Sequence, residues 1–302
     1  MASAKPRRRR TEPPARRPTP PPWWLPTSLW ELWTELDERA ARLPVACNEY
    51  GYDPFGYDPR WTTRLALPLA LLYRHWLRVE TTGIENVPDG RVLLIANHAG
   101  NTFAYDAAML STALLLEREP PRIARGMGEY YLPTVPFFNV LMQRMGSVVG
   151  TPENCIALLE HEEAVMVFPE GQRGFIKPYA EAYELKEFGL GFLRMALQTG
   201  TPIVPVGIVG SEEQSPGLAR VESLGRAIGA PALPITLTFP LLGPLAVIPL
   251  PVKFRIAFGE PLHFAGDPND EDAHVREHVR VVEDRIRALV RQGLDARDGW
   301  FR

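Results

Sequence analysis

Short apolar runs alternate with longer segments of helical periodicity through most of the chain. The run Val92–Ala96 has no polar residue, which is typical of a strand covered on both faces. Strands are expected at 78–82, 92–96, 122–125, 147–149, 165–168, 203–209 and 253–258. The spacing predicts helices over 102–117, 134–144, 152–163, 188–199 and 269–292, the last with Asn269 as its N-cap. This alternation predicts an α/β fold, in which a mostly parallel central sheet is flanked by helices.

Two apolar segments precede this alternation. Residues 28–43 place leucines, tryptophans and alanines on one helical face, and Ser28 with Glu31 fits a capping box. That face could pack on the domain, or its tryptophans could enter a membrane interface, and the sequence leaves both open. Residues 65–77 are apolar but too short to cross a bilayer, and Pro68 lies within them, so we expect a core or interfacial helix.

Residues 227–252 carry no charged side chain. Their length would suit a membrane-spanning helix. However, six prolines lie among them, and each proline removes a backbone hydrogen-bond donor, which argues strongly against such a helix. Two interpretations remain, a buried loop or an apolar hairpin that contacts a bilayer or lines an acyl pocket.

The charge of the chain is unevenly distributed. Residues 1–22 carry seven basic side chains and one acidic one, so the rest of the chain is more acidic than the net charge of −3 indicates. An acidic body is not typical of a protein that binds nucleic acid. The basic arm is rich in proline and poor in apolar residues, so we expect it to be disordered, either as a solvated tail or as a tether to anionic lipid.

The composition, with 45% hydrophobic and 23% charged residues in a chain of 302, is typical of a globular protein. We expect residues 1–45 to form a disordered arm followed by an amphipathic helix, and residues 46–302 to form one domain. No apolar segment follows the early arginines, so a signal peptide is not expected. The two cysteines lack metal-ligand spacing and indicate a reducing compartment.

Polar residues directly follow the predicted strand Val92–Ala96. Asn97 and His98 come next, and Asp106 lies eight residues beyond His98. Histidine ordinarily titrates near neutral pH, so it suits the removal of a proton from a hydroxyl group. Asp106 could accept a hydrogen bond from one ring nitrogen and leave the other nitrogen free to act as a base. A purely structural histidine is the alternative interpretation.

A second polar group follows the predicted strand 165–168. It contains Glu170, Gly171 and Arg173. Glycine lets the backbone approach a ligand closely, and a guanidinium group can hold a phosphate through two hydrogen bonds. The carboxyl ends of neighbouring parallel strands meet at one edge of a sheet, where ligands bind in α/β folds. We therefore expect His98 and Glu170 to share one site, although an ion pair in a surface turn would give the same pattern.

These two groups resemble sequence blocks of the glycerolipid acyltransferase superfamily, which includes the 1-acylglycerol-3-phosphate acyltransferases. The segment Asn97–Asp106 resembles the first block, and Phe168–Arg173, which reads FPEGQR, matches the third. Pro136–Ser147 and Thr201–Val206 look like the second and the fourth. The resemblance covers about residues 78–265.

The resemblance implies that a fatty acyl group is transferred from an acyl thioester to the hydroxyl of a glycerolipid or another lipid alcohol. The donor would be acyl-CoA or an acyl-carrier protein, and no bound cofactor is implied. His98 would be the general base and Asp106 the residue that orients it. Glu170 and Arg173 would organise the acceptor, with Asn97 and Gly171 in the same substrate site. The protein would work at the cytoplasmic face of a membrane, as a peripheral protein.

Two features depart from the family pattern. Seven residues separate His98 from Asp106, where the family usually has four. Residues 148–151 contain no arginine, although family members that act on glycerol phosphates often carry one there. The cations that could replace it are Arg125, Lys177 and Lys186. If none of these cations binds a phosphate, the acceptor would be uncharged, such as a diacylglycerol.

Two other functions fit the same sequence. One is a non-catalytic lipid-binding or scaffolding protein with the same fold, which the long spacing between His98 and Asp106 would explain. The other is acyl transfer to a non-glycerolipid acceptor, such as a lipid amine.

His274 and His278 lie four residues apart on a predicted helix, as zinc ligands can. Their neighbours are charged and no third ligand is evident, so we expect no metal site.

Overall fold

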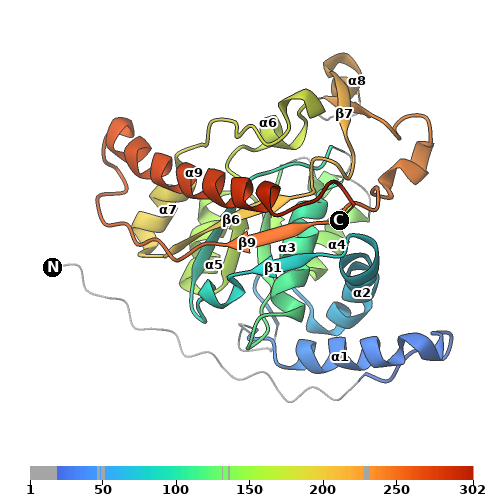
Figure 1. Ribbon diagram of the computed structural model, residues 1–302. Helices are drawn as coiled ribbons and strands as arrows, with labels where there is room; N and C mark the ends of the chain where they lie inside the picture. The colour runs from blue at the N-terminus through green and yellow to red at the C-terminus, as the bar shows by residue number, and fades with distance from the viewer. Residues whose placement is uncertain are drawn as a thin grey trace.

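The central feature of the molecule, seen here in a computed structural model, is a sheet of seven strands (Figure 1). The structure describes residues 19–45, 48, 52–101, 103–130, 132–134, 137–227 and 232–301. The strands are β1 (Glu80–Thr82), β2 (Val92–Ala96), β3 (Ala124–Gly128), β4 (Val148–Val149), β5 (Ala164–Val167), β6 (Ile203–Val209) and β9 (Arg255–Phe258). Their order is β1-β9-β6-β2-β5-β3-β4, and only the contact between β6 and β9 is antiparallel. The predicted mostly parallel sheet is therefore confirmed.

Helices cover both faces of this sheet (Figure 1). The helices on one face are α1 (Trp30–Ala41), α2 (Pro59–Leu71) and α3 (Tyr105–Leu116). Those on the other face are α5 (Pro152–Glu160), α7 (Gly191–Thr199) and α9 (Asp272–Asp295). Leu94 of β2 packs in the first core and Leu93 and Ile95 in the second, because successive residues of a strand point to opposite faces. This double burial explains why β2 is apolar throughout.

Short elements connect these layers. The short helices are α4 (Phe138–Arg144), α6 (Gln172–Phe175) and α8 (Glu222–Ala227). A separate antiparallel pair consists of β7 (Gly217–Val221) and β8 (Leu233–Thr236). The 3₁₀ turns are η1 (Thr27–Leu29), η3 (Ile84–Asn86), η4 (Leu132–Thr134), η5 (Tyr179–Glu181) and η6 (Gly243–Val247), and η2 (Leu72–Trp76) is a π-helical turn.

Most predicted elements are present, and several ends differ. The strands at 92–96 and 203–209 have the predicted bounds. The N-cap of α9 is Glu271, so the prediction of Asn269 at that position is wrong. Ser28 lies inside η1, and no side-chain hydrogen bond caps α1, so the predicted capping box is also wrong.

The apolar face of α1 packs on the domain. Leu32, Trp33 and Leu36 are buried in the same core as α2 and α3. The indole Nε1 of Trp33 donates a hydrogen bond to the carbonyl oxygen of Thr19, at 2.7 Å. These three side chains cannot also enter a membrane, so the packing interpretation is confirmed for them, whereas Trp30 at the start of the helix is exposed.

The uncharged segment 227–252 is a largely exposed part of the surface where the structure describes it. It contributes β8 and η6, and several of its large apolar side chains face solvent, Leu241 most of all. The interpretation as a buried loop is therefore wrong. None of the described helices combines the length and the hydrophobicity that crossing a bilayer requires.

Replacing Trp33 by alanine should lower the free energy of unfolding by about 3–5 kcal/mol, because the change leaves a large cavity in the core and removes the hydrogen bond to Thr19. Trp24→Ala is the matched control, since that indole is 63% exposed and its loss should change stability by less than about 0.5 kcal/mol. Unfolding in denaturant measures both. Equal midpoints for the two variants would contradict the packing of α1.

Candidate active site

His98 and Asp106 form a close pair at the carboxyl end of β2. The Nδ1 atom of His98 lies 2.7 Å from Oδ2 of Asp106, which also accepts a hydrogen bond from the backbone N–H of Ala99 at 2.8 Å. Asp106 is fully buried in the first turn of α3. An ionised carboxylate only accepts hydrogen bonds, so in a pair of ionised Asp106 and neutral His98 the ring proton lies on Nδ1 and the lone pair of Nε2 is free.

The chain between the two residues bends back to close the long spacing. Asn101 has a left-handed backbone with φ of 57°, a conformation that asparagine tolerates better than most residues. Its N–H donates to the carbonyl oxygen of Phe175, and its side-chain amide donates to that of Ser215. These contacts hold the bend against two other loops, so the seven intervening residues do not separate His98 from Asp106.

Two aromatic rings hold the imidazole. The ring of Phe168 stacks on His98 with a centroid distance of 4.3 Å, and the ring of Phe175 lies 4.9 Å away. Apolar rings exclude water from the imidazole and restrict its rotation. The imidazole is therefore held in one orientation.

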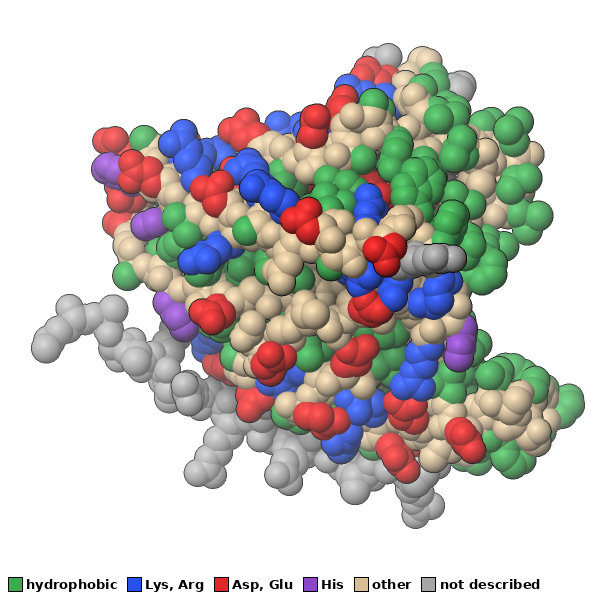
Figure 2. All heavy atoms as spheres, in the orientation of Figure 1, with side chains coloured by type: hydrophobic (Ala, Val, Ile, Leu, Met, Phe, Trp, Pro, Cys, Tyr) green, Lys and Arg blue, Asp and Glu red, His purple; other side chains and the backbone are tan. Residues whose placement is uncertain are grey.

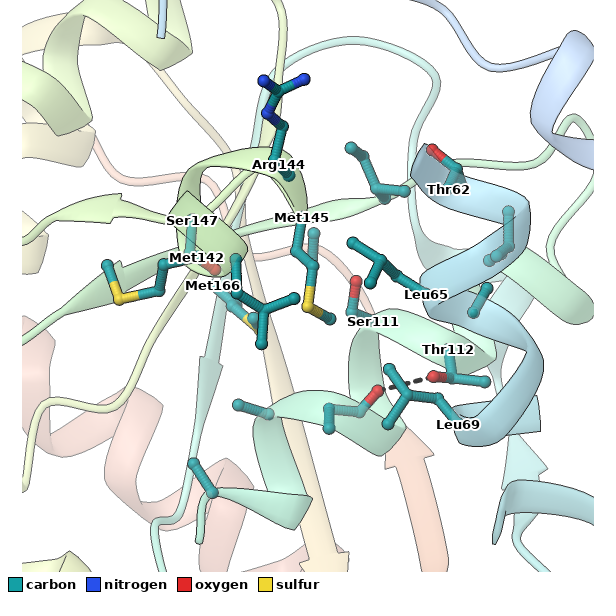
Figure 3. Close-up of a pocket in the computed structure, with 18 of the residues that line it drawn as sticks. Thr62, Leu65, Leu69, Ser111, Thr112, Met142, Arg144, Met145, Ser147 and Met166 are labelled. Atoms are coloured by element: carbon teal, nitrogen blue, oxygen red, sulfur yellow. Dashed lines mark hydrogen bonds between the residues drawn. The ribbon is translucent and has the colours of Figure 1, made fainter. Parts of the chain in front are cut away.

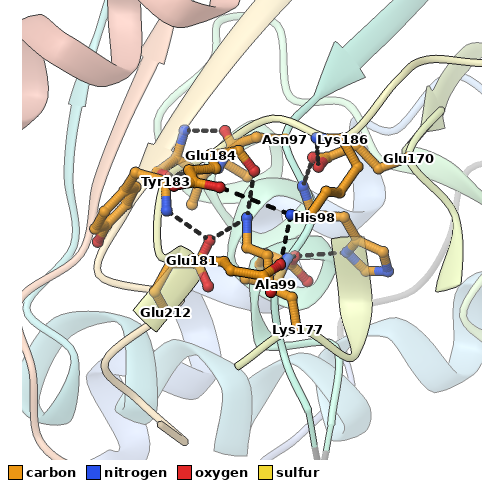
Figure 4. A network of polar contacts seen from close by, with 12 residues as sticks. Asn97, His98, Ala99, Glu170, Lys177, Glu181, Tyr183, Glu184, Lys186 and Glu212 are labelled. Atoms are coloured by element: carbon orange, nitrogen blue, oxygen red, sulfur yellow. Dashed lines mark hydrogen bonds and ion pairs between the residues drawn. The ribbon is translucent and has the colours of Figure 1, made fainter. Parts of the chain in front are cut away.

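Glu170 joins the loop after β2 to the loop before α7. Its two carboxylate oxygens accept hydrogen bonds from the backbone N–H groups of His98, at 2.9 Å, and Lys186, at 2.7 Å (Figure 4). Burial raises the pKa of this carboxyl group, while nearby Lys177 and the two N–H donors oppose the rise. The side chain thus positions His98 through the backbone.

The other residues expected in the third block take different places. Gly171 lies in the pocket wall described below, with φ of 56° and ψ of −145°, a conformation that is essentially restricted to glycine. Arg173 is not among the described residues that line the pocket, and it donates to the carbonyl oxygen of Glu187 at 2.9 Å. Asn97 is buried, and its side chain exchanges two hydrogen bonds with the backbone of Ile208, which joins the ends of β2 and β6.

Two of the three cations expected to replace the missing arginine, Arg125 and Lys177, are neutralised by buried acids. Arg125 pairs with Asp53 at 2.9 Å, and both side chains are about 1% exposed. Lys177 pairs with Glu212 at 2.7 Å and also donates to the carbonyl oxygen of Glu184 (Figure 4). Burial raises the pKa of Glu212 to about 7, although Lys177 lowers it. Neither cation lies in the pocket wall beside His98.

The third candidate cation is also occupied. Lys186 pairs with Glu181 at 2.5 Å and lies 3.8 Å from the carboxylate of Glu184. These ion pairs raise its pKa. Its backbone N–H contacts Glu170, but its ammonium group is absent from the pocket wall.

A pocket of about 500 Å³ opens beside His98. Its described lining is mostly apolar and includes Phe103, Met142 and Phe168, together with Ala232–Pro234 from the uncharged segment. Among the described lining residues there is no lysine or arginine, and the one carboxylate is that of Glu129. No described residue forms an ion pair or hydrogen bond with this carboxylate. The pocket can hold apolar groups next to the imidazole of His98, and its described wall offers no cationic side chain to an anion.

A second, smaller pocket of about 160 Å³ adjoins the first and lies between α2, α3 and α4 (Figure 3). Seven residues line both pockets, and these are Phe103, Ala104, Ala107, Phe138, Met142, Ser147 and Met166. Small residues at the start of α3, Ala107, Ala108 and Ser111, and Ala104 just before it contribute to the wall of this pocket. Their helical spacing is the sequence signal that could have located this pocket. Glu129 and Phe175 also belong to the site, but no periodicity or motif in the sequence marks them as site residues.

Several known proteins are similar to this chain in sequence. Residues 78–209 match the Acyltransferase protein family. The chain is 39% identical over 250 residues to the uncharacterized protein Rv0502 of Mycobacterium tuberculosis, which covers 82% of this chain and 69% of that protein. It is 37% identical over 281 residues to the uncharacterized protein ML2427 of Mycobacterium leprae, with coverages of 89% and 76%. The crystal structure of the 1-acyl-sn-glycerophosphate acyltransferase PlsC from Thermotoga maritima aligns with a TM-score of 0.48, at 20% identity, over 80% of this chain and 84% of that one.

The chain belongs to the glycerolipid acyltransferase superfamily. The resemblance inferred from the sequence blocks is thereby confirmed. Membership supports an enzyme that transfers acyl groups to glycerolipids in general, with a lipid acceptor and an acyl donor.

Arg125→Ala should lower the free energy of unfolding by about 3–5 kcal/mol, because it leaves the buried carboxylate of Asp53 without its counter-ion. Arg173→Ala removes one exposed hydrogen bond and should change stability by less than about 0.5 kcal/mol. Denaturant unfolding of the two variants distinguishes these roles. An Arg125→Ala protein as stable as wild type would contradict a structural role for the ion pair of Arg125 with Asp53.

Proposed function

We propose that this protein transfers a fatty acyl group from an acyl thioester to a lipid hydroxyl, with His98 as the general base. The observation that carries the proposal is the 2.7 Å contact between Nδ1 of His98 and Asp106, which leaves Nε2 as the proton acceptor. The aromatic rings around the imidazole and the apolar pocket beside it support the same role.

The chemistry follows from this arrangement. The acceptor hydroxyl gives its proton to Nε2, and its oxygen attacks the thioester carbonyl carbon. The C–S bond then breaks, and the departing thiolate takes the proton back from Nε2. An ester and a free thiol leave, and His98 returns to its neutral form. A thioester is already activated, so positioning and proton transfer can supply much of the rate enhancement.

We further propose that the acceptor is uncharged where it enters the pocket. Arg125 and Lys177 are neutralised by Asp53 and Glu212. The unpaired carboxylate of Glu129 would repel a phosphate from the pocket wall. A diacylglycerol or another lipid alcohol fits these charges better than a glycerol phosphate does. The non-catalytic alternative loses its main support, because the long spacing does not separate His98 from Asp106.

His98→Ala should reduce thiol release from acyl-CoA or acyl-carrier protein, in the presence of lipid acceptor, by about 10²–10⁴-fold, because the general base is lost. Asp106→Asn should also reduce it, since an amide no longer orients the ring in the same way. His274→Ala, an exposed histidine on α9, is the matched control and should retain full activity. Equal rates for wild type and His98→Ala would refute the proposed base.

A panel of acceptors in the same detergent micelles tests the acceptor class. We expect kcat/KM for diacylglycerol to exceed that for lysophosphatidic acid by at least about tenfold, which corresponds to roughly 1.4 kcal/mol of discrimination. Glu129→Gln should narrow this ratio by raising the rate with lysophosphatidic acid, because it removes the repelling charge. A lipid amine belongs in the same panel. Preference for lysophosphatidic acid in both proteins would contradict an uncharged acceptor.

A further inference from the structure

The part of the uncharged segment between Leu237 and Leu250, which we name the apolar lobe, projects large aliphatic side chains into solvent. Leu241 is 85% exposed and Leu245 is 64% exposed, and Leu242, Val247 and Ile248 are exposed as well. Figure 2 shows hydrophobic side chains gathered along the right of the molecule, where Figure 1 places this part of the chain. A cluster of this kind marks an interaction surface.

The fold holds the apolar lobe in place. The hydroxyl of Tyr105 donates to the carbonyl oxygen of Val247 at 2.7 Å, and Nε1 of Trp76 donates to that of Pro249 at 2.8 Å. The N–H of Leu250 donates to the carbonyl oxygen of Gln214 at 2.8 Å. Three separate elements therefore anchor the segment with its aliphatic side chains outward, so the exposure is built into the structure.

A second apolar cluster lies on the same side of the molecule in Figures 1 and 2. It consists of Trp23, Trp24 and Trp30, next to the start of α1, and all three indoles are exposed. Tryptophan is enriched where a membrane meets water, because its ring is apolar and its N–H is polar. The basic arm, with seven cationic side chains between residues 5 and 17, directly precedes this cluster in the sequence. Anionic lipid complements that charge.

The occupant that fits both clusters is a bilayer. Aliphatic side chains on the lobe, tryptophans at a second point and a cationic stretch that precedes them in the sequence are the features of an interfacial anchor. In the sequence, the lobe follows shortly after Ala232–Pro234, and these three residues line the pocket beside His98. A lipid acceptor would thus have a short path from the membrane to the base.

We propose that the apolar lobe inserts into the interface of an anionic bilayer, with Trp23 and Trp24 as the second contact. The lobe supplies affinity that does not depend on lipid charge. The arm supplies attraction that depends on anionic lipid and weakens with salt. This proposal rests on the proposed function in one respect only, which is that the pocket beside His98 receives a lipid substrate from the membrane.

Sedimentation with vesicles of phosphatidylcholine, with or without phosphatidylglycerol, tests the full-length protein. The double variant Leu241→Asp and Leu245→Asp should bind vesicles of both compositions at least about thirtyfold more weakly, because each aspartate must be placed in an apolar environment. Val281→Asp is the matched control, since this exposed aliphatic residue lies on α9, away from the lobe in Figure 1, and its binding should equal that of wild type.

The arm and the tryptophans are tested separately in the same assay. Replacing Arg7, Arg8, Arg9 and Arg10 by glutamine should weaken binding to the anionic vesicles at low salt and leave binding to phosphatidylcholine unchanged. The double variant Trp23→Ala and Trp24→Ala should weaken binding to both compositions, because the lost contact is interfacial.

Three results would overturn the proposal. One is wild-type-like binding by the lobe variant, and another is a wild-type protein that binds neither vesicle. The third is a wild-type dimer, detected by analytical ultracentrifugation, that the lobe variant converts to a monomer, since the lobe would then be covered by a second copy. His98→Ala separates the two proposals, because it should bind vesicles normally whatever becomes of the acyl transfer. The lobe variant, in turn, should keep its rate with an acceptor dispersed in detergent.

Discussion

The parallel pairing of β2 with β5 sets the position of the whole site. Ile95 lies opposite Val167 in the register of the two strands, so the residues three positions further along, His98 and Glu170, leave the sheet side by side. The hydrogen bond from the backbone of His98 to Glu170 continues this pairing beyond the last strand residues. A shift in register would separate His98 from the carboxylate that accepts its backbone hydrogen bond. The geometry of the site therefore depends on a strand pairing that the two apolar cores maintain.

Buried charge is the second constraint. The structure encloses two ion pairs, Arg125 with Asp53 and Lys177 with Glu212, close to a pocket whose described walls are largely apolar. Each pair offsets the cost of removing its charges from water and leaves little charge to offer a ligand. The pair formed by Lys177 also steadies the loop that carries the N–H contact to Glu170. These cations thus shape the site from outside the pocket.

Much of this arrangement could be predicted from sequence, and the remainder depends on contacts between distant residues. The strands β2 and β6 are uniformly apolar because both their faces are buried, so their bounds were predictable. The pairing of His98 with Asp106 depends on a bend at Asn101, and the hydrophobic periodicity of the sequence does not predict this bend. The partner of Arg125 lies 72 residues away, so charge alone could not distinguish a ligand-binding arginine from a structural one.

The hydrogen bond from Tyr105 to Val247 has a mechanical consequence. Tyr105 is the first residue of α3, and Asp106 is the next, so the apolar lobe is hydrogen-bonded to the same helical turn that carries the partner of His98. With the lobe inserted in a bilayer as proposed, its depth would fix the height of the imidazole above the acyl chains. The reactive hydroxyl of a lipid would have to rise to that height, so acceptors would be selected by how far they can leave the membrane plane.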